Sequence, residues 1–196
     1  RETKRRENII IELKKQKLKD FEIIDAVDGD KIEKSELDKL ISVCNEGYSK
    51  YNFFVPATAL REFTWNIFAA QYIEMAKARA YGIGFDDDER DGAIFTLHKV
   101  LSTILKLLAP ITPFITEHLW LTLYSEDSIH KEQLPEIENV EDMTAMNQSI
   151  IEFNSRVWNE KKQNNLSLKD SIKIEIPENL NQFKKDLVAM HNLEIN

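Results

Sequence analysis

The sequence predicts a mainly α-helical fold, and three observations support this prediction. The 196 residues include only five glycines and five prolines, too few for the many turns of an all-β chain. Long segments repeat apolar residues every three or four positions, the period of a helix that buries one face. Only segments 21–27, 171–176 and 193–195 read as candidate strands. With 42% hydrophobic residues, we expect one sizeable helical bundle and a small C-terminal α/β element.

The longest predicted helix spans residues 56–81 and organises the bundle. Pro56 suits a first helical turn, where its missing N–H costs nothing. Gly82 and Gly84 end the helix, because glycine adopts the left-handed conformation without a side-chain clash. Its aromatic residues widen the apolar stripe, so we expect neighbouring helices on two sides. The stripe and its aromatic flank are Leu60, Phe63, Thr64, Trp65, Ile67, Phe68, Gln71, Tyr72, Met75, Ala78 and Tyr81.

Three further elements are predicted before this helix. Residues 1–19 suit an amphipathic helix, and segment 21–27 precedes a turn at residues 28–30. A helix then starts near Ser35, a plausible N-cap, and continues to about Tyr48.

Four more helices follow in chain order. After an acidic loop at 83–92, a helix is expected over 91–109, ended by the Pro110-Ile-Thr-Pro113 break. Pro113 then occupies the first position of a helix that reaches about residue 125. A second acidic loop, 126–139, leads to a helix over 141–163. The tail contains the strand 171–176, a helix over 178–191 and a possible strand at 193–195.

Composition limits the class of protein. The net charge of −8 lies mostly in segments 20–47, 82–92 and 126–145, which carry −6, −4 and −6, so the core helices remain able to meet a phosphate backbone. A single cysteine indicates a reducing, cytoplasmic setting. No apolar run reaches the roughly 20 residues of a membrane span, so we expect no membrane partner. The missing initiator methionine indicates a fragment of a longer protein.

No catalytic or metal site is predicted. The four histidines lie in different elements without ligand spacing, and no glycine loop suits a phosphate. Asp28-Gly-Asp30 and Asp86-Asp-Asp88 offer carboxylates that suit a hard cation, but solvated turns are the commoner reason for such runs.

Aromatic and basic residues on the helices are the remaining functional candidates. Exposed rings stack on unpaired bases, and cations contact phosphates. The candidate RNA-binding residues are Phe53, Arg61, Lys77, Arg79, Tyr81, Lys99, Lys106, Arg156, Lys161 and Lys162.

Two stretches resemble a known family. Residues 48–82, with Phe63-Thr-Trp-Asn-Ile-Phe68 at their centre, and Leu107-Leu-Ala-Pro-Ile-Thr-Pro-Phe-Ile-Thr-Glu-His-Leu-Trp120 resemble the anticodon-binding domain of class I aminoacyl-tRNA synthetases. Within that class the stretches are most similar to the archaeal valyl type; the isoleucyl and leucyl types are alternatives.

The resemblance implies that tRNA binding and catalysis lie in different domains of one ligase. Residues 35–165 would form the class I anticodon-binding helical bundle that grips the anticodon stem-loop of valine tRNA, and residues 166–196 the α/β tail. A separate catalytic domain of the same ligase would use ATP and Mg²⁺; its His-Ile-Gly-His and Lys-Met-Ser-Lys-Ser motifs do not occur here, so this fragment is not itself expected to be an enzyme or to need a cofactor. Signature residues expected to fix helix crossings are Trp65, Asn66, Tyr72, Pro110, Pro113, Glu117 and Trp120.

The N-terminal segment resembles a different family. In residues 1–34, Arg5-Arg6 and Asp25-Ala-Val-Asp-Gly29 are similar to the N-terminal region of lipooligosaccharide-type glycosyltransferases. The segment is either a divergent lead-in or a fused foreign piece. A sugar-transferring fragment and a protein-docking helical bundle are therefore the competing hypotheses for the chain.

Overall fold

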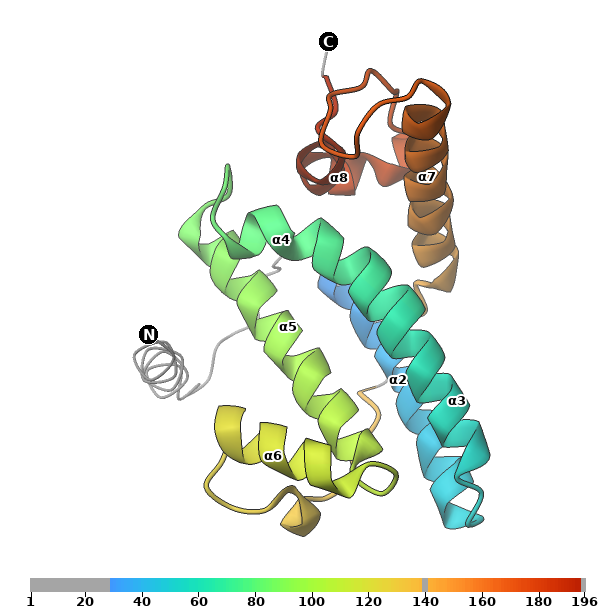
Figure 1. The fold of residues 1–196 in the computed structure, drawn as a ribbon, viewed down its shortest axis with the longest axis vertical. Helices are drawn as coiled ribbons and strands as arrows, with labels where there is room; N and C mark the ends of the chain where they lie inside the picture. Colours follow the sequence, from blue (N-terminus) through green and yellow to red (C-terminus); the bar gives the residue numbers. More distant parts are fainter. Residues whose placement is uncertain (1–28, 139–140, 195–196) are drawn as a thin grey trace.

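The computed structural model describes residues 29–138 and 141–194, and this part of the chain is mainly helical (Figure 1). The helix expected over 1–19 and the strand expected over 21–27 lie outside the described residues. The predicted mainly α class is confirmed. The elements are α2 (Gly29–Ser49), α3 (Phe54–Glu62), η1 (Phe63–Ile73), α4 (Glu74–Ala80), α5 (Asp87–Leu108), α6 (Pro113–Leu123), η2 (Ile129–Lys131), α7 (Thr144–Gln163), η3 (Glu178–Phe183) and α8 (Lys184–His191).

The long central helix forms from α3, η1 and α4, which follow one another without a break. Pro56 lies in its first turn, as expected. At the other end Gly82 has a φ of 67°, and Ile83 N donates to Ala78 O over 2.8 Å. Gly82 N donates to Arg79 O, which completes the paired hydrogen bonds of a glycine-terminated helix.

The middle of this helix departs from the predicted α-helical period. Residues 63–73 are π-helical, with hydrogen bonds from i to i+5 and a wider turn. The buried positions there are Phe63, Phe68 and Tyr72, a spacing of five and then four. Trp65 is consequently turned outward and is 75% exposed, so the expectation that it packs in the bundle is wrong.

A main apolar core joins most of the elements, and a second, smaller cluster around Trp120 packs α6 on the end of α5. α2 contacts α3, α5 and α7, while α4 contacts α5 and α8. In Figure 1, α6 lies against the lower end of α5, and α7 and α8 lie at the opposite end of the molecule. The main cluster includes Leu40, Cys44, Leu60, Phe68, Tyr72, Val100, Ile104, Leu107, Phe153, Val157, Phe183 and Leu187. Residues of the tail therefore share the core of the bundle, and the division at residue 165 stays a prediction.

Two helix starts differ from the sequence expectation. α2 begins at Gly29, so Ser35 lies inside the helix rather than at its N-cap; its hydroxyl accepts from Met143 N at 3.1 Å and links α2 to α7. α5 begins at Asp87, because Asp86 and Glu89 form a reciprocal capping box. The acidic run that was expected as a solvated loop therefore starts a helix.

The tail contains less β structure than predicted. Within the described residues, segments 171–176 and 193–194 meet only at a parallel bridge between Ile172 and Leu193. Ile172, Ile174 and Ile176 are half-buried while the residues between them are exposed. The alternation of apolar and polar residues in 171–176 therefore reflects an extended segment that buries one side, paired with segment 193–194 at this single bridge.

Gly47 is predicted to be intolerant of a side chain. A Cβ there would lie 2.5 Å from Pro56 Cγ and 2.6 Å from Pro56 Cδ, where α2 meets α3. We expect Gly47→Ala to lower the free energy of unfolding by about 1–3 kcal/mol through overpacking, although alanine is otherwise the better helix former. Urea denaturation tests this expectation.

The control for this prediction removes the opposing ring. In a Pro56→Ala background, Gly47→Ala should cost less, with a coupling free energy above about 0.5 kcal/mol in the double-mutant cycle. A Gly47→Ala protein as stable as the parent contradicts the close approach.

Candidate nucleic-acid interface

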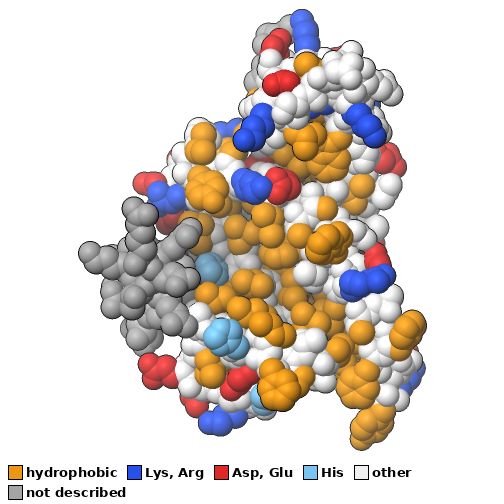
Figure 2. All heavy atoms as spheres, viewed as in Figure 1, with side chains coloured by type: hydrophobic (Ala, Val, Ile, Leu, Met, Phe, Trp, Pro, Cys, Tyr) orange, Lys and Arg blue, Asp and Glu red, His pale blue; other side chains and the backbone are white. Residues whose placement is uncertain are grey.

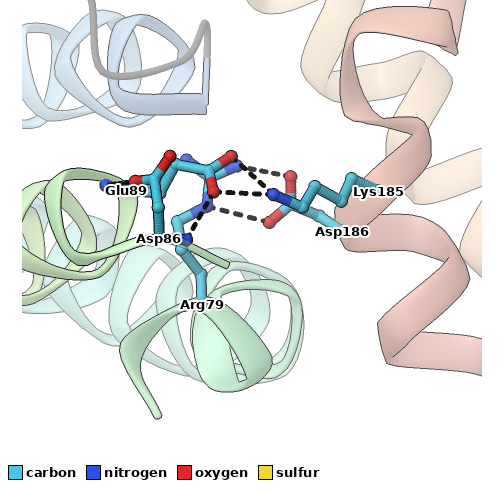
Figure 3. A network of polar contacts seen from close by, with 5 residues as sticks. All are labelled: Arg79, Asp86, Glu89, Lys185 and Asp186. Atoms are coloured by element: carbon cyan, nitrogen blue, oxygen red, sulfur yellow. Dashed lines mark hydrogen bonds and ion pairs between the residues drawn. The ribbon is translucent and has the colours of Figure 1, made fainter. Parts of the chain in front are cut away.

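The structure places Arg79 in the interior rather than on an RNA-facing surface. Its side chain is 6% exposed, and its guanidinium makes two hydrogen bonds to Asp186 of α8, one of them Nε to Oδ1 at 3.0 Å (Figure 3). Its charge is therefore used within the protein. The prediction that Arg79 binds RNA is corrected here: it is a structural residue that joins α4 to α8.

A second pair extends this network to the start of α5. Lys185 Nζ lies 2.6 and 2.9 Å from the two carboxylate oxygens of Glu89, which also accepts from Asp86 N in the capping box (Figure 3). Lys185 holds the pKa of Glu89 below its ordinary value, while burial raises the pKa of Asp186. Three elements, α4, α5 and α8, are thus fixed around the turn at residues 81–86.

That turn presents Tyr81 to solvent. The ring is 78% exposed, and Ile83 beside it is 67% exposed. Lys77, one turn earlier, is exposed and pairs with Glu74. A rigidly supported, solvent-facing ring near cations is suited to stack on an unpaired base. We call Lys77 and Tyr81, with the network beneath them, the α4–α5 corner.

Lys161 is the second predicted RNA ligand that the structure buries. It is fully buried, and Nζ donates to the carbonyl oxygens of Leu168 at 2.7 Å and His191 at 2.8 Å. Burial lowers the pKa of Lys161. The prediction of phosphate contact is corrected: this ammonium closes the tail onto α7.

The two other cations of α7 remain on the surface. Arg156 Nη2 donates to Glu175 O at 2.9 Å, and its guanidinium lies 5.2 Å from the Phe153 ring centroid. Lys162 is exposed and makes no ion pair with another described residue. These two side chains stay candidates for phosphate contact.

Lys99 and Lys106 lie on one face of α5, beneath the acidic loop that follows α6. Lys106 Nζ is 2.8 Å from Glu132 Oε2 and 5.1 Å from the Trp120 ring centroid. Lys99 pairs with Glu138. Both cations are therefore neutralised locally by carboxylates of the same chain.

Phe53 and Arg61 lie at the other end of the long helix. Phe53 is 46% exposed, and its ring centroid is 5.6 Å from that of Tyr48. Arg61 pairs with the neighbouring Glu62 at 2.7 Å. Because Phe53 and Tyr81 are 28 residues apart along a helix, they lie roughly 40 Å apart at about 1.5 Å per residue. The candidates thus occupy separate places rather than one pocket.

The signature residues divide into core and surface positions. Tyr72 and Trp120 are 4% and 6% exposed, and Tyr72 stacks on Phe68. Glu117 accepts from Ser128 Oγ and Ile129 N, which fastens the loop after α6. Pro113 is the first residue of α6, while Pro110 is exposed. Asn66, expected at a helix crossing, is exposed and donates to Glu62 on its own helix.

Four further large apolar side chains are exposed, although their exposure was not predicted from the sequence. Trp65, Phe114, Ile115 and Leu121 are 75%, 91%, 54% and 45% exposed. The last three lie on α6. In Figure 2, apolar side chains gather over the middle of one face, and lysines and arginines lie towards its edges. The middle of this face is suited to contact another protein surface, not a phosphate backbone.

The described residues offer neither a cluster of metal ligands nor a helix suited to a membrane. The described residues contain no group of three or more His, Cys, Asp or Glu side chains placed to hold a metal ion. Asp86 belongs to the capping box, whereas Asp28 lies outside the described residues. Of the helices in residues 29–138 and 141–194, none is both long and apolar enough to cross a membrane.

Comparison with known proteins identifies the family. The family described as "Anticodon-binding domain of tRNA ligase" matches residues 30–176. The chain is 39% identical over 153 residues to the valine–tRNA ligase of Pyrobaculum aerophilum and 37% over 145 residues to that of Nanoarchaeum equitans; each match covers 74% of this chain and 19% or 18% of the relative. The enzyme of Ehrlichia ruminantium (strain Gardel) is 32% identical over 142 residues, 72% of this chain and 18% of its own.

The matches cover a small part of each relative but most of this chain. The chain spans about a fifth of the length of the curated relatives it matches. The family profile, in contrast, covers three quarters of the chain, including α3 to α7 with the long helix and the double-proline break. The chain therefore belongs to the family of anticodon-binding domains of tRNA ligases.

Proposed function

We propose that this domain binds the anticodon stem-loop of valine tRNA and positions the tRNA for aminoacylation. The observation that carries the proposal is the family match over residues 30–176, together with the three relatives compared above, each of which is named a valine–tRNA ligase. Those names favour the valyl type over the isoleucyl and leucyl types. Neither a sugar-transferring fragment nor a docking bundle without RNA is favoured by any of these matches.

The proposed partner in the same polypeptide is the catalytic domain of the ligase. The relatives are about five times longer than the matched region, and neither ATP-handling motif occurs in these 196 residues. ATP and Mg²⁺ would act in that domain, in the cytoplasm where translation takes place. The apolar side chains exposed on α6, Phe114, Ile115 and Leu121, support a packing surface for such a neighbour.

The α4–α5 corner is the part of the surface that we propose to meet the RNA. We expect Tyr81→Ala to weaken tRNA binding by about 1–3 kcal/mol, because the exposed ring loses its stacking on a base. Tyr81→Phe keeps the ring and is the matched control, so its affinity should equal that of the parent. Filter binding measures both, and equal affinities for the alanine and phenylalanine variants contradict the role of Tyr81.

The function itself is tested by titration with whole tRNAs at two salt concentrations. Binding of valine tRNA should weaken as salt rises, because phosphate contacts release counterions. Unrelated tRNAs of the same length control for charge alone. Equal, weak affinity for all tRNAs contradicts the proposal.

A further inference from the structure

The loop that follows α6 is acidic and lies over two lysines of α5. Residues 126–138, the acidic strap, contain five acidic residues and one lysine, a net charge of −4. The strap crosses the face of α5 that carries Lys99 and Lys106, and its Glu138 and Glu132 pair with those lysines. Carboxylates of the same chain thus pair with both lysines of this face.

The two halves of the strap are held very differently. In the first half, Ile129 is 2% exposed and packs with Trp120, while Ile129 N donates to Glu117 Oε2 at 2.9 Å. In the second half, Leu134 and Ile137 are 40% and 41% exposed. Little apolar burial therefore holds residues 132–138 against the helices.

A cavity lies beneath the second half. It has a volume of about 430 Å³ and is bounded by Leu37 and Ile41 of α2, Ser102 and Thr103 of α5, and the strap itself. The polar links across it include Glu138 N to Asp38 Oδ1 at 2.9 Å and Asn45 Nδ2 to Pro135 O at 3.4 Å. Lifting residues 132–138 would break these two hydrogen bonds and two ion pairs, and it would free both lysines beside Asp38 of α2.

The spacing of the lysines suits a polyanion. Lys99 and Lys106 are seven residues apart, so they lie on one side of α5 about 10 Å from each other along the axis. Exposed ion pairs with single carboxylates contribute only about 0–1 kcal/mol each. An RNA strand releases condensed counterions when it takes their place, which gives it an advantage at low salt.

From this arrangement we propose that the Lys99–Lys106 face of α5 is an RNA phosphate-binding surface, and that the acidic strap competes with RNA for it. The inference rests on the proposed function. The acidic strap of the domain then competes with RNA for the two lysines and thereby sets the affinity and the salt dependence of RNA binding.

The test compares two charge-matched variants of the whole chain with the parent. Glu132→Gln/Glu138→Gln removes the two carboxylates that pair with the lysines. Glu126→Gln/Glu136→Gln removes two acidic charges of the same strap that make no ion pair with a described residue, and it is the control. Valine tRNA binding is measured for each variant at salt concentrations from about 50 to about 200 mM, the range over which phosphate contacts change affinity strongly.

Glu132→Gln/Glu138→Gln should bind valine tRNA roughly two- to thirtyfold more tightly than the control variant. This is the factor expected when two surface ion pairs no longer compete with the RNA. If the freed lysines gain phosphate contacts that the parent does not make, its salt slope should steepen by about 1.4. Adding Lys99→Ala/Lys106→Ala should abolish both gains. In the parent, amide hydrogen exchange in residues 132–138 should accelerate when tRNA is added.

The outcomes separate this inference from the proposed function. If the parent binds valine tRNA but the two glutamine variants have equal affinities and slopes, the strap does not compete and the inference is overturned. A gain that persists without the two lysines overturns it as well. If neither the parent nor any variant binds tRNA, the proposed function fails first.

Discussion

Arg79→Met should lower the free energy of unfolding by about 3–5 kcal/mol, since it leaves the Asp186 carboxylate buried without its partner. Methionine preserves most of the side-chain length, so the loss reports the charge rather than a large cavity. The effect should be greater at pH 8 than at pH 5. Burial raises the pKa of Asp186, and removing Arg79 removes a group that lowers it, so the carboxyl takes up a proton as the pH falls and the unpaired charge disappears.

Two controls accompany this variant in urea denaturation. Arg61→Met removes an exposed partner of Glu62 and should cost less than about 1 kcal/mol. Arg79→Met/Asp186→Leu removes both charges and should recover most of the loss, because a buried pair replaced by apolar groups is often neutral. If Arg79→Met lowers the free energy of unfolding by less than about 1 kcal/mol at every pH, the buried Arg79–Asp186 pair does not stabilise the packing of α4 on α8.

His191 should make the stability of the domain depend on pH in mildly acidic solution. The ring is 1% exposed, and Nε2 lies 2.8 Å from Asn154 Oδ1. Burial, and secondarily Lys161, lowers the pKa of His191 from 6.5 to about 4. The unfolded chain therefore binds the proton first. Stability from the neutral ring is complete above pH 6.5 and is lost as the pH falls towards 4, by up to roughly 3 kcal/mol at about 1.4 kcal/mol per pH unit.

Comparison of two glutamine variants isolates this contribution. His191→Gln keeps a hydrogen-bond donor but cannot titrate, so the difference in unfolding free energy between it and the parent should change between pH 7 and pH 4. His130→Gln alters an exposed ring and should follow the parent. Parallel curves for His191→Gln and the parent would contradict the buried neutral histidine.

The fold could be predicted largely from local signals. Apolar periodicity, Gly82 and the double-proline break at Pro110 and Pro113 are properties of short segments, and each helix they predicted within the described residues is present. The π-helical segment could not be predicted, because the sequence was read with a period of 3.6 residues. Trp65 was expected to pack because aromatic residues commonly fill the cores of helical bundles, and its exposure could not be read from residue type.

The location of charged residues was harder to predict, because whether a lysine or arginine is buried or exposed depends on the groups with which it pairs. Arg79 and Lys161 resemble surface cations in the sequence, yet Asp186 is 107 residues from Arg79 and the His191 carbonyl is 30 residues from Lys161. The strap likewise reads as a solvated acidic loop until Glu132 and Glu138 are seen against α5. Long-range pairing of this kind leaves no periodic signal in a single sequence.

We propose that this domain reads the anticodon of valine tRNA, and a titration with the isolated hairpin tests this reading. The affinity of the chain for an anticodon stem-loop with the valine anticodon is compared with that for the same stem carrying a substituted anticodon. We expect a preference of at least about tenfold, or 1.4 kcal/mol, for the valine hairpin. Equal affinities for the two hairpins would contradict the claim.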